Sequence, residues 1–122
     1  MKIDRFDDII AWQKAKELAL SVYSLFSESR DFGFRDQIQR ASVSIMNNIA
    51  EGFERRTNNE FKHFLFIAKG SCGEVRSMVY LAKELNKISE NDFKTLFQKS
   101  EEISKILSWL IKTLLTFNFS NF

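Results

Sequence analysis

The sequence predicts an all-α protein, folded as an antiparallel four-helix bundle in up-down-up-down order within one domain spanning residues 1–122. The chain has no proline and only four glycines, so helical segments can run with few interruptions. Apolar residues recur every three or four positions in four successive runs, which is the period of a helix with one buried face. The connections of about three to six residues between the runs force neighbouring helices to run antiparallel.

The first two runs predict helices over about residues 8–28 and 34–51. The stripe of the first run contains Ile9, Trp12, Ala15, Ala19, Val22 and Phe26. Residues 29–33 are expected to break the helix. The stripe of the second run contains Phe34, Ile38, Ala41, Ile45 and Ile49. Gly52 is expected to end this helix, because glycine tolerates the left-handed conformation common at helix C-termini.

The third and fourth runs predict helices over about residues 58–85 and 90–117. Each begins with a capping pattern, Thr57 with Glu60 in the third and Ser89 with Asp92 in the fourth. The third stripe contains Phe61, Phe64, Leu65, Ala68, Cys72, Val75, Val79, Ala82 and Leu85. The fourth contains Phe93, Leu96, Phe97, Ile103, Leu107, Leu110, Leu114 and Phe117. Residues 86–88 are expected to end the third helix, and the tail from residue 118 is expected to fray.

Composition favours a soluble protein and a cytoplasmic location. Hydrophobic residues make up 44% and charged residues 28% of the chain, a balance typical of a globular domain. The longest apolar stretch, residues 106–115, is interrupted by Lys112 and is shorter than the roughly 20 residues that cross a bilayer. The single cysteine, Cys72, cannot form an internal disulfide, and no secretory leader pattern is evident.

Surplus apolar residues predict a homo-oligomer that assembles through the second and third helices. Residues outside the expected core stripes are Phe66, Ile67, Met78, Tyr80 and Leu81, then Val43, Met46 and Ala50, and finally Phe117, Phe119 and Phe122. Extensive exposed apolar surface usually marks a protein contact. The alternative is a wide core with scattered surface hydrophobic residues.

Two glycines lie inside the third helix, where each costs up to about 1 kcal/mol relative to alanine. Gly70 and Gly73, with Ala68, Ser71 and Cys72, form a small-residue patch that would let another helix approach closely. A local bend is the competing interpretation. With Phe66 and Glu74 these glycines and Ser71 are candidate residues of a subunit interface.

A polar line accompanies the apolar stripe of the second helix. Arg40, Ser44, Asn48 and Glu51 are spaced four, four and three residues apart and therefore share a face. We interpret them as a hydrogen-bonded network that fixes helix register or a subunit contact, in preference to an active site.

No enzyme, cofactor or metal site is predicted. The only histidine, His63, has no assigned partner for a nucleophilic triad. Glu60 and His63 have the Glu-x-x-His spacing of di-iron bundles, but such a centre needs a second pair from another helix.

Four bases recur at intervals of seven residues in the third helix, and we call them the basic stripe: Lys62, Lys69, Arg76 and Lys83. None has an acidic residue three or four positions away on its own helix, so partners from elsewhere are expected. Acidic groups of neighbouring helices or subunits are one possibility, and nucleic-acid phosphates are the other. Arg55 and Arg56, in the preceding loop, would extend the stripe.

The stretch Gln37-Ile-Gln-Arg-Ala-Ser-Val-Ser-Ile-Met-Asn-Asn-Ile-Ala-Glu-Gly-Phe53 resembles the signature of the 23S rRNA intervening-sequence protein family, also called four helix bundle proteins. The opening segment with Phe6, Ile9 and the Trp12–Ala15 run, and the third-helix segment from Phe61 to Glu74, resemble the same family. Met46 stands where the family usually has proline.

The resemblance implies a four-helix bundle that assembles as a ring, commonly a pentamer. It also implies kinship with accessory proteins of diversity-generating retroelements, which look like partners of a reverse transcriptase and its nucleic acid. Two functional hypotheses follow: a non-enzymatic oligomeric scaffold that binds RNA or DNA backbones through the basic stripe, or a protein-interaction module without nucleic-acid binding of its own. Membranes are not expected partners.

Overall fold

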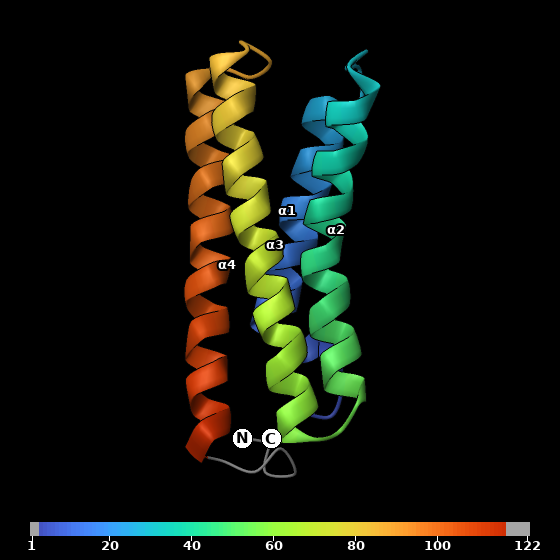
Figure 1. Ribbon diagram of the computed structural model, residues 1–122, viewed down its shortest axis with the longest axis vertical. Coiled ribbons are helices and arrows are strands. Elements are labelled where there is room, and N and C mark those ends of the chain that lie inside the picture. Colours follow the sequence, from blue (N-terminus) through green and yellow to red (C-terminus); the bar gives the residue numbers. More distant parts are fainter. Residues whose placement is uncertain (1–2, 117–122) are drawn as a thin grey trace.

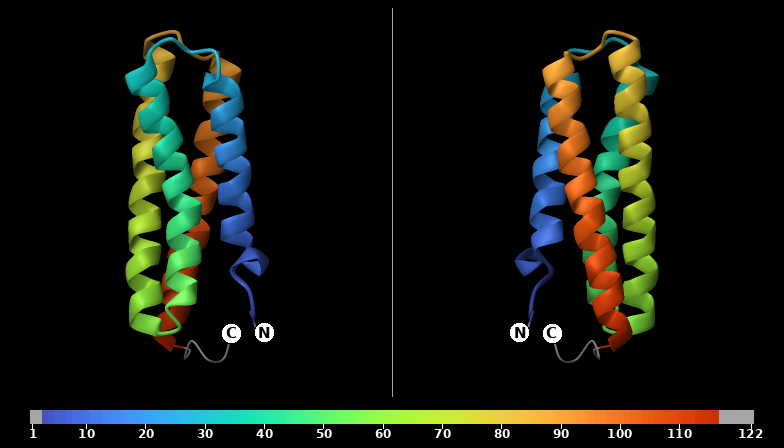
Figure 2. Two further views of the ribbon diagram at one scale, coloured as in Figure 1. Left: turned by 90° about the vertical axis from the view of Figure 1, so that its right-hand side faces the viewer. Right: turned by 90° about the vertical axis from the view of Figure 1, so that its left-hand side faces the viewer.

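The computed structural model describes residues 3–116 and has the predicted fold class, an all-α bundle of four helices (Figure 1). The elements are a short 3₁₀ helix η1 (Phe6–Asp8), α1 (Ile10–Phe26), α2 (Phe32–Glu54), α3 (Asn58–Glu84) and α4 (Glu90–Thr116). Successive helices run in opposite directions, and α1 begins at the end of the bundle where α4 finishes (Figures 1 and 2). Each helix packs on two neighbours, and α4 closes the bundle against α1. No helix among the described residues is long and apolar enough to cross a bilayer.

Most of the core comes from the helical stripes. It also includes Leu18 and Phe53, which the stripes left out, whereas Leu85 of the third stripe is exposed. The largest fully buried side chains are Phe26, Phe53, Phe61, Leu18, Ile38, Ile45, Ile49, Leu65, Leu96, Ile103, Leu107 and Val22. The rings of Phe53 and Phe61 meet edge to face, 5.9 Å apart, where α2 turns into α3. Met78 is also buried, so its assignment to the surplus apolar surface was wrong.

Side chains cap three of the helices. The Asp31 carboxylate accepts from the backbone N–H of Phe34, which starts α2 two residues earlier than predicted. Both capping patterns read from the sequence are confirmed, since the Thr57 hydroxyl accepts from the Glu60 N–H and the Ser89 hydroxyl accepts from the Asp92 N–H. These bonds satisfy backbone donors that the first helical turn leaves without partners.

The helix ends differ in part from the prediction. Gly52 does not end α2, because the helix continues to Glu54 and the left-handed residue after it is Arg56, with φ of 64°. The end of α3 is as expected: Asn86 is left-handed, with φ of 58°, and the Lys87 N–H donates to the Ala82 carbonyl. α1 is shorter than predicted at both ends. It begins at Ile10, because Ile9 is extended and separates η1 from α1, and it ends at Phe26.

Gly52 is needed for packing instead. A Cβ added at this position would lie 2.6 Å from the Cβ of Phe64 and 3.2 Å from the Phe61 ring. Only glycine therefore lets α2 and α3 approach this closely where their connection begins. The predicted fourth-helix end at Phe117, and the surplus residues Phe119 and Phe122, lie outside the described residues.

Candidate functional site

The basic stripe lies along the seam between α3 and α4. Arg76 donates to both the carbonyl and the hydroxyl of Ser100, each at 3.3 Å. One heptad further, Lys83 pairs with Glu90 at 3.3 Å and lies over the Phe93 ring at 4.5 Å. Because residues seven apart share a helix face, Lys62 and Lys69 lie on the same side of α3.

Of the alternatives left open for the stripe, a neighbouring helix supplies the partners of its second half, Arg76 and Lys83. Arg76 is half-buried and belongs to a small hydrogen-bonded group with Ser100 and Cys72. The fully buried Ser100 hydroxyl accepts from Arg76 and donates to the Cys72 carbonyl at 3.0 Å. Lys83 already has a carboxylate and an aromatic ring. Neither base is therefore wholly available to a phosphate.

Lys62 and Lys69 differ from the other half of the stripe. Within residues 3–116 neither makes a hydrogen bond or an ion pair, and both side chains are half-buried, so their aliphatic stems lie against the helix surface. Their ammonium groups are the unpaired charge of the stripe in this part of the chain.

Arg55 and Arg56 do not extend the stripe. Arg55 pairs with Glu51 at 2.9 Å and with Glu60 at 3.5 Å, and the hydrogen bond to Glu51 is the main cause that raises the pKa of Arg55. Glu51 belongs to α2, so Arg55 is drawn to the side of α3 that faces α2, away from α4. Arg56 donates to the backbone carbonyl of Asp4 at 3.4 Å and lies over the Phe53 ring.

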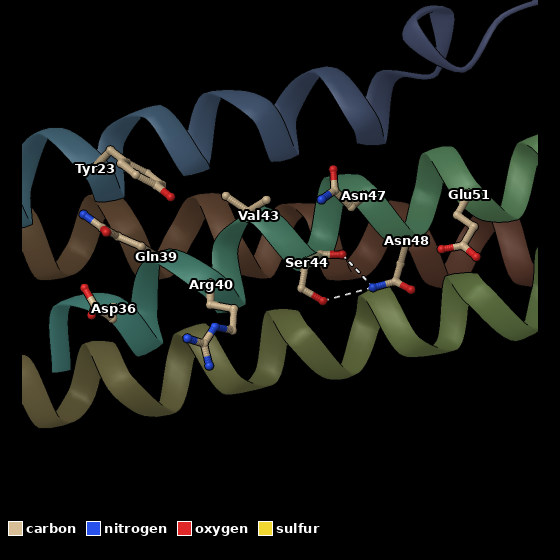
Figure 3. Close-up of a pocket in the computed structure, with 9 residues that line it drawn as sticks. All are labelled: Tyr23, Asp36, Gln39, Arg40, Val43, Ser44, Asn47, Asn48 and Glu51. Carbon is tan, nitrogen blue, oxygen red and sulfur yellow. Dashed lines mark hydrogen bonds between the residues drawn. The ribbon is translucent and has the colours of Figure 1, made fainter. Parts of the chain in front are cut away.

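The polar line of α2 is divided between a packed network and a groove. Asn48 donates to the carbonyl and hydroxyl of Ser44, at 2.8 and 3.0 Å (Figure 3). The Ser44 hydroxyl lies 3.0 Å from that of Ser71 on α3. This network ties the two helices together at one register. Arg40 and Glu51, in contrast, are exposed.

Arg40 lines two open grooves on the outer surface of α2. One, of about 530 Å³, is lined by α2 and by Tyr23 of α1 (Figure 3). The other, of about 560 Å³, lies between α2 and α3 and includes Glu74. Arg40 and Glu74 are opposite charges on the same groove, and neither has an ion pair within the described part of the chain.

The small-residue patch of α3 is divided: Ala68, Ser71 and Cys72 are buried in the bundle, and only the two glycines lie toward the surface of this chain. A Cβ added at Gly70 would meet nothing within 4 Å, and one at Gly73 would meet only the Arg76 guanidinium, at 3.8 Å. No helix of the bundle therefore packs closely on either glycine. Close packing against a second copy stays a prediction for Gly70, the more exposed of the two.

Exposed apolar side chains occupy more of the surface than the sequence suggested. In α3, Phe66, Ile67, Tyr80 and Leu81 are exposed as predicted, whereas Val43, Met46 and Ala50 of α2 are half-buried. Six others lie on α1 and α4, and the sequence reading missed them: Ile10, Leu20, Tyr23, Leu25, Trp109 and Leu115. Each lies next to a stripe residue in the sequence and therefore points about 100° away from it around the helix, outside the stripe.

The described residues do not form a constellation suited to catalysis. The partners of the Ser44 hydroxyl are another hydroxyl and an amide, neither of which can act as a general base. His63 is exposed, and its ring contacts that of Phe64. Burial raises the pKa of the Cys72 thiol to about 12, which outweighs the opposing effect of Arg76 and keeps it protonated. Across residues 3–116, no three His, Cys, Asp or Glu side chains are grouped so as to hold a metal ion.

Comparisons with known proteins agree with the sequence and the fold. The family model described as 23S rRNA-intervening sequence protein matches residues 7–109. The chain is similar to a solved structure from Bacteroides thetaiotaomicron, described as a protein with unknown function from the S23 ribosomal protein family. The two share 26% sequence identity with a TM-score of 0.79, over 84% of this chain and 99% of that one. None of the curated proteins matches the chain.

Proposed function

Because this chain belongs to the 23S rRNA-intervening sequence protein family, we propose that it is a non-enzymatic, homo-oligomeric scaffold that binds RNA or DNA backbones through α3. A ring of five copies is the assembly we propose, and a cytoplasmic location is part of the proposal. The observation that carries nucleic-acid binding is the pair of lysines on the basic stripe, Lys62 and Lys69, whose ammonium groups have no partner among residues 3–116.

The two lysines suit phosphates because of their spacing and their surroundings. Seven residues separate them, which is about 10.5 Å along a helix at about 1.5 Å per residue. No carboxylate of the described residues pairs with either of them, so binding a phosphate would not first require an ion pair to break. Contacts of this kind bind the backbone without reading base sequence.

A separate surface supports assembly. The groove between α2 and α3 carries Arg40 and Glu74, opposite charges without an ion pair in the described residues, beside the open position above Gly70. A second copy could supply a carboxylate to Arg40 and a cation to Glu74. Because this groove lies on the α2 side of α3 and the stripe on the α4 side, assembly and nucleic-acid binding can be tested independently.

A protein-interaction module is the second candidate function. It is favoured by the internal partners of Arg76 and Lys83, which leave less free positive charge than a strongly basic nucleic-acid-binding protein presents. The exposed Trp109 and Ile10 line an apolar groove of about 390 Å³ between α1 and α4, where an apolar segment of another protein would fit.

Charge reversal at the two lysines tests the first function. Lys62→Glu with Lys69→Glu should abolish binding to a fluorescein-labelled oligonucleotide of about 20 bases, measured by anisotropy. The matched control is Lys16→Glu with Lys99→Glu, which changes the net charge by the same amount. Lys16 is on α1. Lys99 is on α4 near Glu102, which pairs with Lys14 of α1. That control should keep most of the affinity.

The salt dependence sharpens the experiment. Replacing both lysines by glutamine should reduce the slope of log K against log salt by about 1.4 if each contacts one phosphate of a single strand. Equal binding by wild type and the double reversal would exclude the stripe as the site. Loss of the oligomer in the double reversal, seen by light scattering, would instead support the protein-interaction module.

A further inference from the structure

The side of α3 that carries the basic stripe also carries exposed aromatic rings between the lysine and arginine side chains. Read along the helix at alternating steps of four and three residues, this side contains Lys62, Phe66, Lys69, Gly73, Arg76, Tyr80 and Lys83. Steps of three and four keep residues on one helix face. Phe66 is 54% exposed and Tyr80 is 52% exposed.

Tyr80 is held in place by aromatic neighbours on α4. Its ring lies 5.3 Å from those of both Phe93 and Phe97, which lie 5.6 Å from each other. Lys83 caps this cluster with its ammonium group 4.5 Å from the Phe93 ring. The Tyr80 ring therefore packs against α4, while the residue remains exposed.

Gly73 lies midway between the two exposed rings and has no side chain to obstruct the path between them. The nearest group to a Cβ placed there is the Arg76 guanidinium, at 3.8 Å. Phe66 and Tyr80 are separated by 14 residues, about 21 Å along the helix. A flexible polymer lying along the seam would meet the Phe66 ring, the glycine and then the Tyr80 ring, with lysine or arginine side chains beside each ring.

This alternation suits a single-stranded nucleic acid better than a protein or a duplex. Unpaired bases can stack on aromatic side chains while their phosphates contact the adjacent lysines, whereas a duplex keeps its base faces covered. A protein segment would prefer continuous apolar surface, such as the groove lined by Ile9, Ile10 and Trp109.

We propose that the α3–α4 seam binds single-stranded nucleic acid, with bases stacked on Phe66 and Tyr80 and phosphates bound by Lys62 and Lys69. This inference rests on the proposed function and goes further, because it specifies the strandedness of the ligand and adds two residues that contact bases. Arg76 has a structural role in the seam, and Lys83 supports the aromatic cluster.

The test uses the full chain and three labelled probes of about 20 residues: oligothymidylate, oligouridylate and a DNA duplex. Wild type should bind at least one of the single strands at least about tenfold more tightly than the duplex. Replacing Phe66 and Tyr80 together by leucine, which keeps apolar volume at both positions, should remove that preference and leave duplex affinity unchanged. Replacing both by tryptophan should preserve it, because the indole ring stacks at least as well.

The matched control replaces two exposed aromatic residues elsewhere, Phe32→Leu on α2 and Trp109→Leu on α4, and should leave all three affinities unchanged. A single-strand preference that persists in the double leucine variant would overturn the inference and leave the proposed function standing. Absence of binding to any probe by the wild type would overturn both. Should the double leucine variant change the molar mass in light scattering, the rings belong to a subunit contact and the inference is also overturned.

Discussion

Gly52 of α2 and Phe64 of α3 approach so closely that a methyl group on the glycine would lie 2.6 Å from the Cβ of the phenylalanine. The contact joins two helices at the point where the chain passes from one to the other. Real Cβ atoms essentially never lie this close together, so the helices must separate or Phe64 must move if a side chain is added.

We therefore expect Gly52→Ala to destabilise the protein by about 1–3 kcal/mol, although alanine is the better helix former. Gly33→Ala is the matched control, since a Cβ at Gly33 meets nothing within 4 Å, and it should be neutral or stabilising by up to about 1 kcal/mol. Urea unfolding followed by circular dichroism measures both. Equal stability of the two variants would contradict the close approach.

Gly70 tests the proposed assembly. Because the position is open within one chain, Gly70→Leu should fold normally, yet its side chain should prevent a second copy from packing on α3. We expect the molar mass in multi-angle light scattering to fall toward that of one chain. Gln98→Leu, at an exposed position on α4, should leave the mass unchanged. An intact oligomer in the Gly70 variant would remove this glycine from the interface.

Arg76 and Lys69 should respond differently to truncation although both belong to the basic stripe. Arg76→Ala is expected to cost about 1–3 kcal/mol, because the buried Ser100 would lose the guanidinium that bonds it. Lys69→Ala should change stability by no more than about 0.5 kcal/mol, as is usual at a surface position without partners. Denaturant unfolding midpoints measure the stability of both variants. A similar loss of stability in the two would argue against the structural role of Arg76.

The buried thiol should be inert in the folded protein. With the pKa of Cys72 raised to about 12 by burial, its thiolate is scarce at pH 8 and reaction with an aromatic disulfide reagent should require unfolding. Ser77→Cys, on an exposed position of the same helix, should react at once. The unfolded thiol ionises at lower pH than the folded one, so this group lowers stability as pH rises from about 9 to about 12. Prompt labelling of native wild type would contradict the burial.

The connection between α1 and α2 should weaken in acid. Asp31 caps α2 and pairs with Lys87 at 3.1 Å, and the hydrogen bond from Lys87, followed by that from Phe34, lowers the pKa of its carboxyl. Its stabilising effect is present above the unfolded pKa and is lost as pH falls through the folded pKa. Asp31→Asn should therefore be less stable than wild type at pH 7, and the difference should shrink below about pH 4. A difference independent of pH would show that the charge contributes nothing.

The starts of α3 and α4 could be predicted because capping is local. Thr57 and Ser89 each bond to a backbone N–H three residues later, and both partners are visible in the sequence. The end of α2 could not be predicted in this way. Gly52 is a residue type common at helix C-termini, but its role depends on Phe64, twelve residues later, and on how α3 packs against α2.

The candidate site was only partly readable for a similar reason. Seven-residue spacing places Lys62, Lys69, Arg76 and Lys83 on one side of α3 whatever the fold. Whether each base is free depends on the neighbouring helix: Ser100 and Glu90 of α4 take up the second pair, and nothing described takes up the first. The position of the Tyr80 ring likewise depends on α4, because Phe93 and Phe97 of that helix hold the ring in place.

The sequence by itself determined the four helices, their buried stripes and the order in which they pack, because helical period, capping and short connections act within a few residues of each other. The tertiary structure decided which charges remain unpaired, which glycine permits close packing and where apolar side chains reach the surface. Those outcomes depend on the rotation and register of each helix against its neighbours, which side-chain contacts between distant residues set and no local pattern encodes.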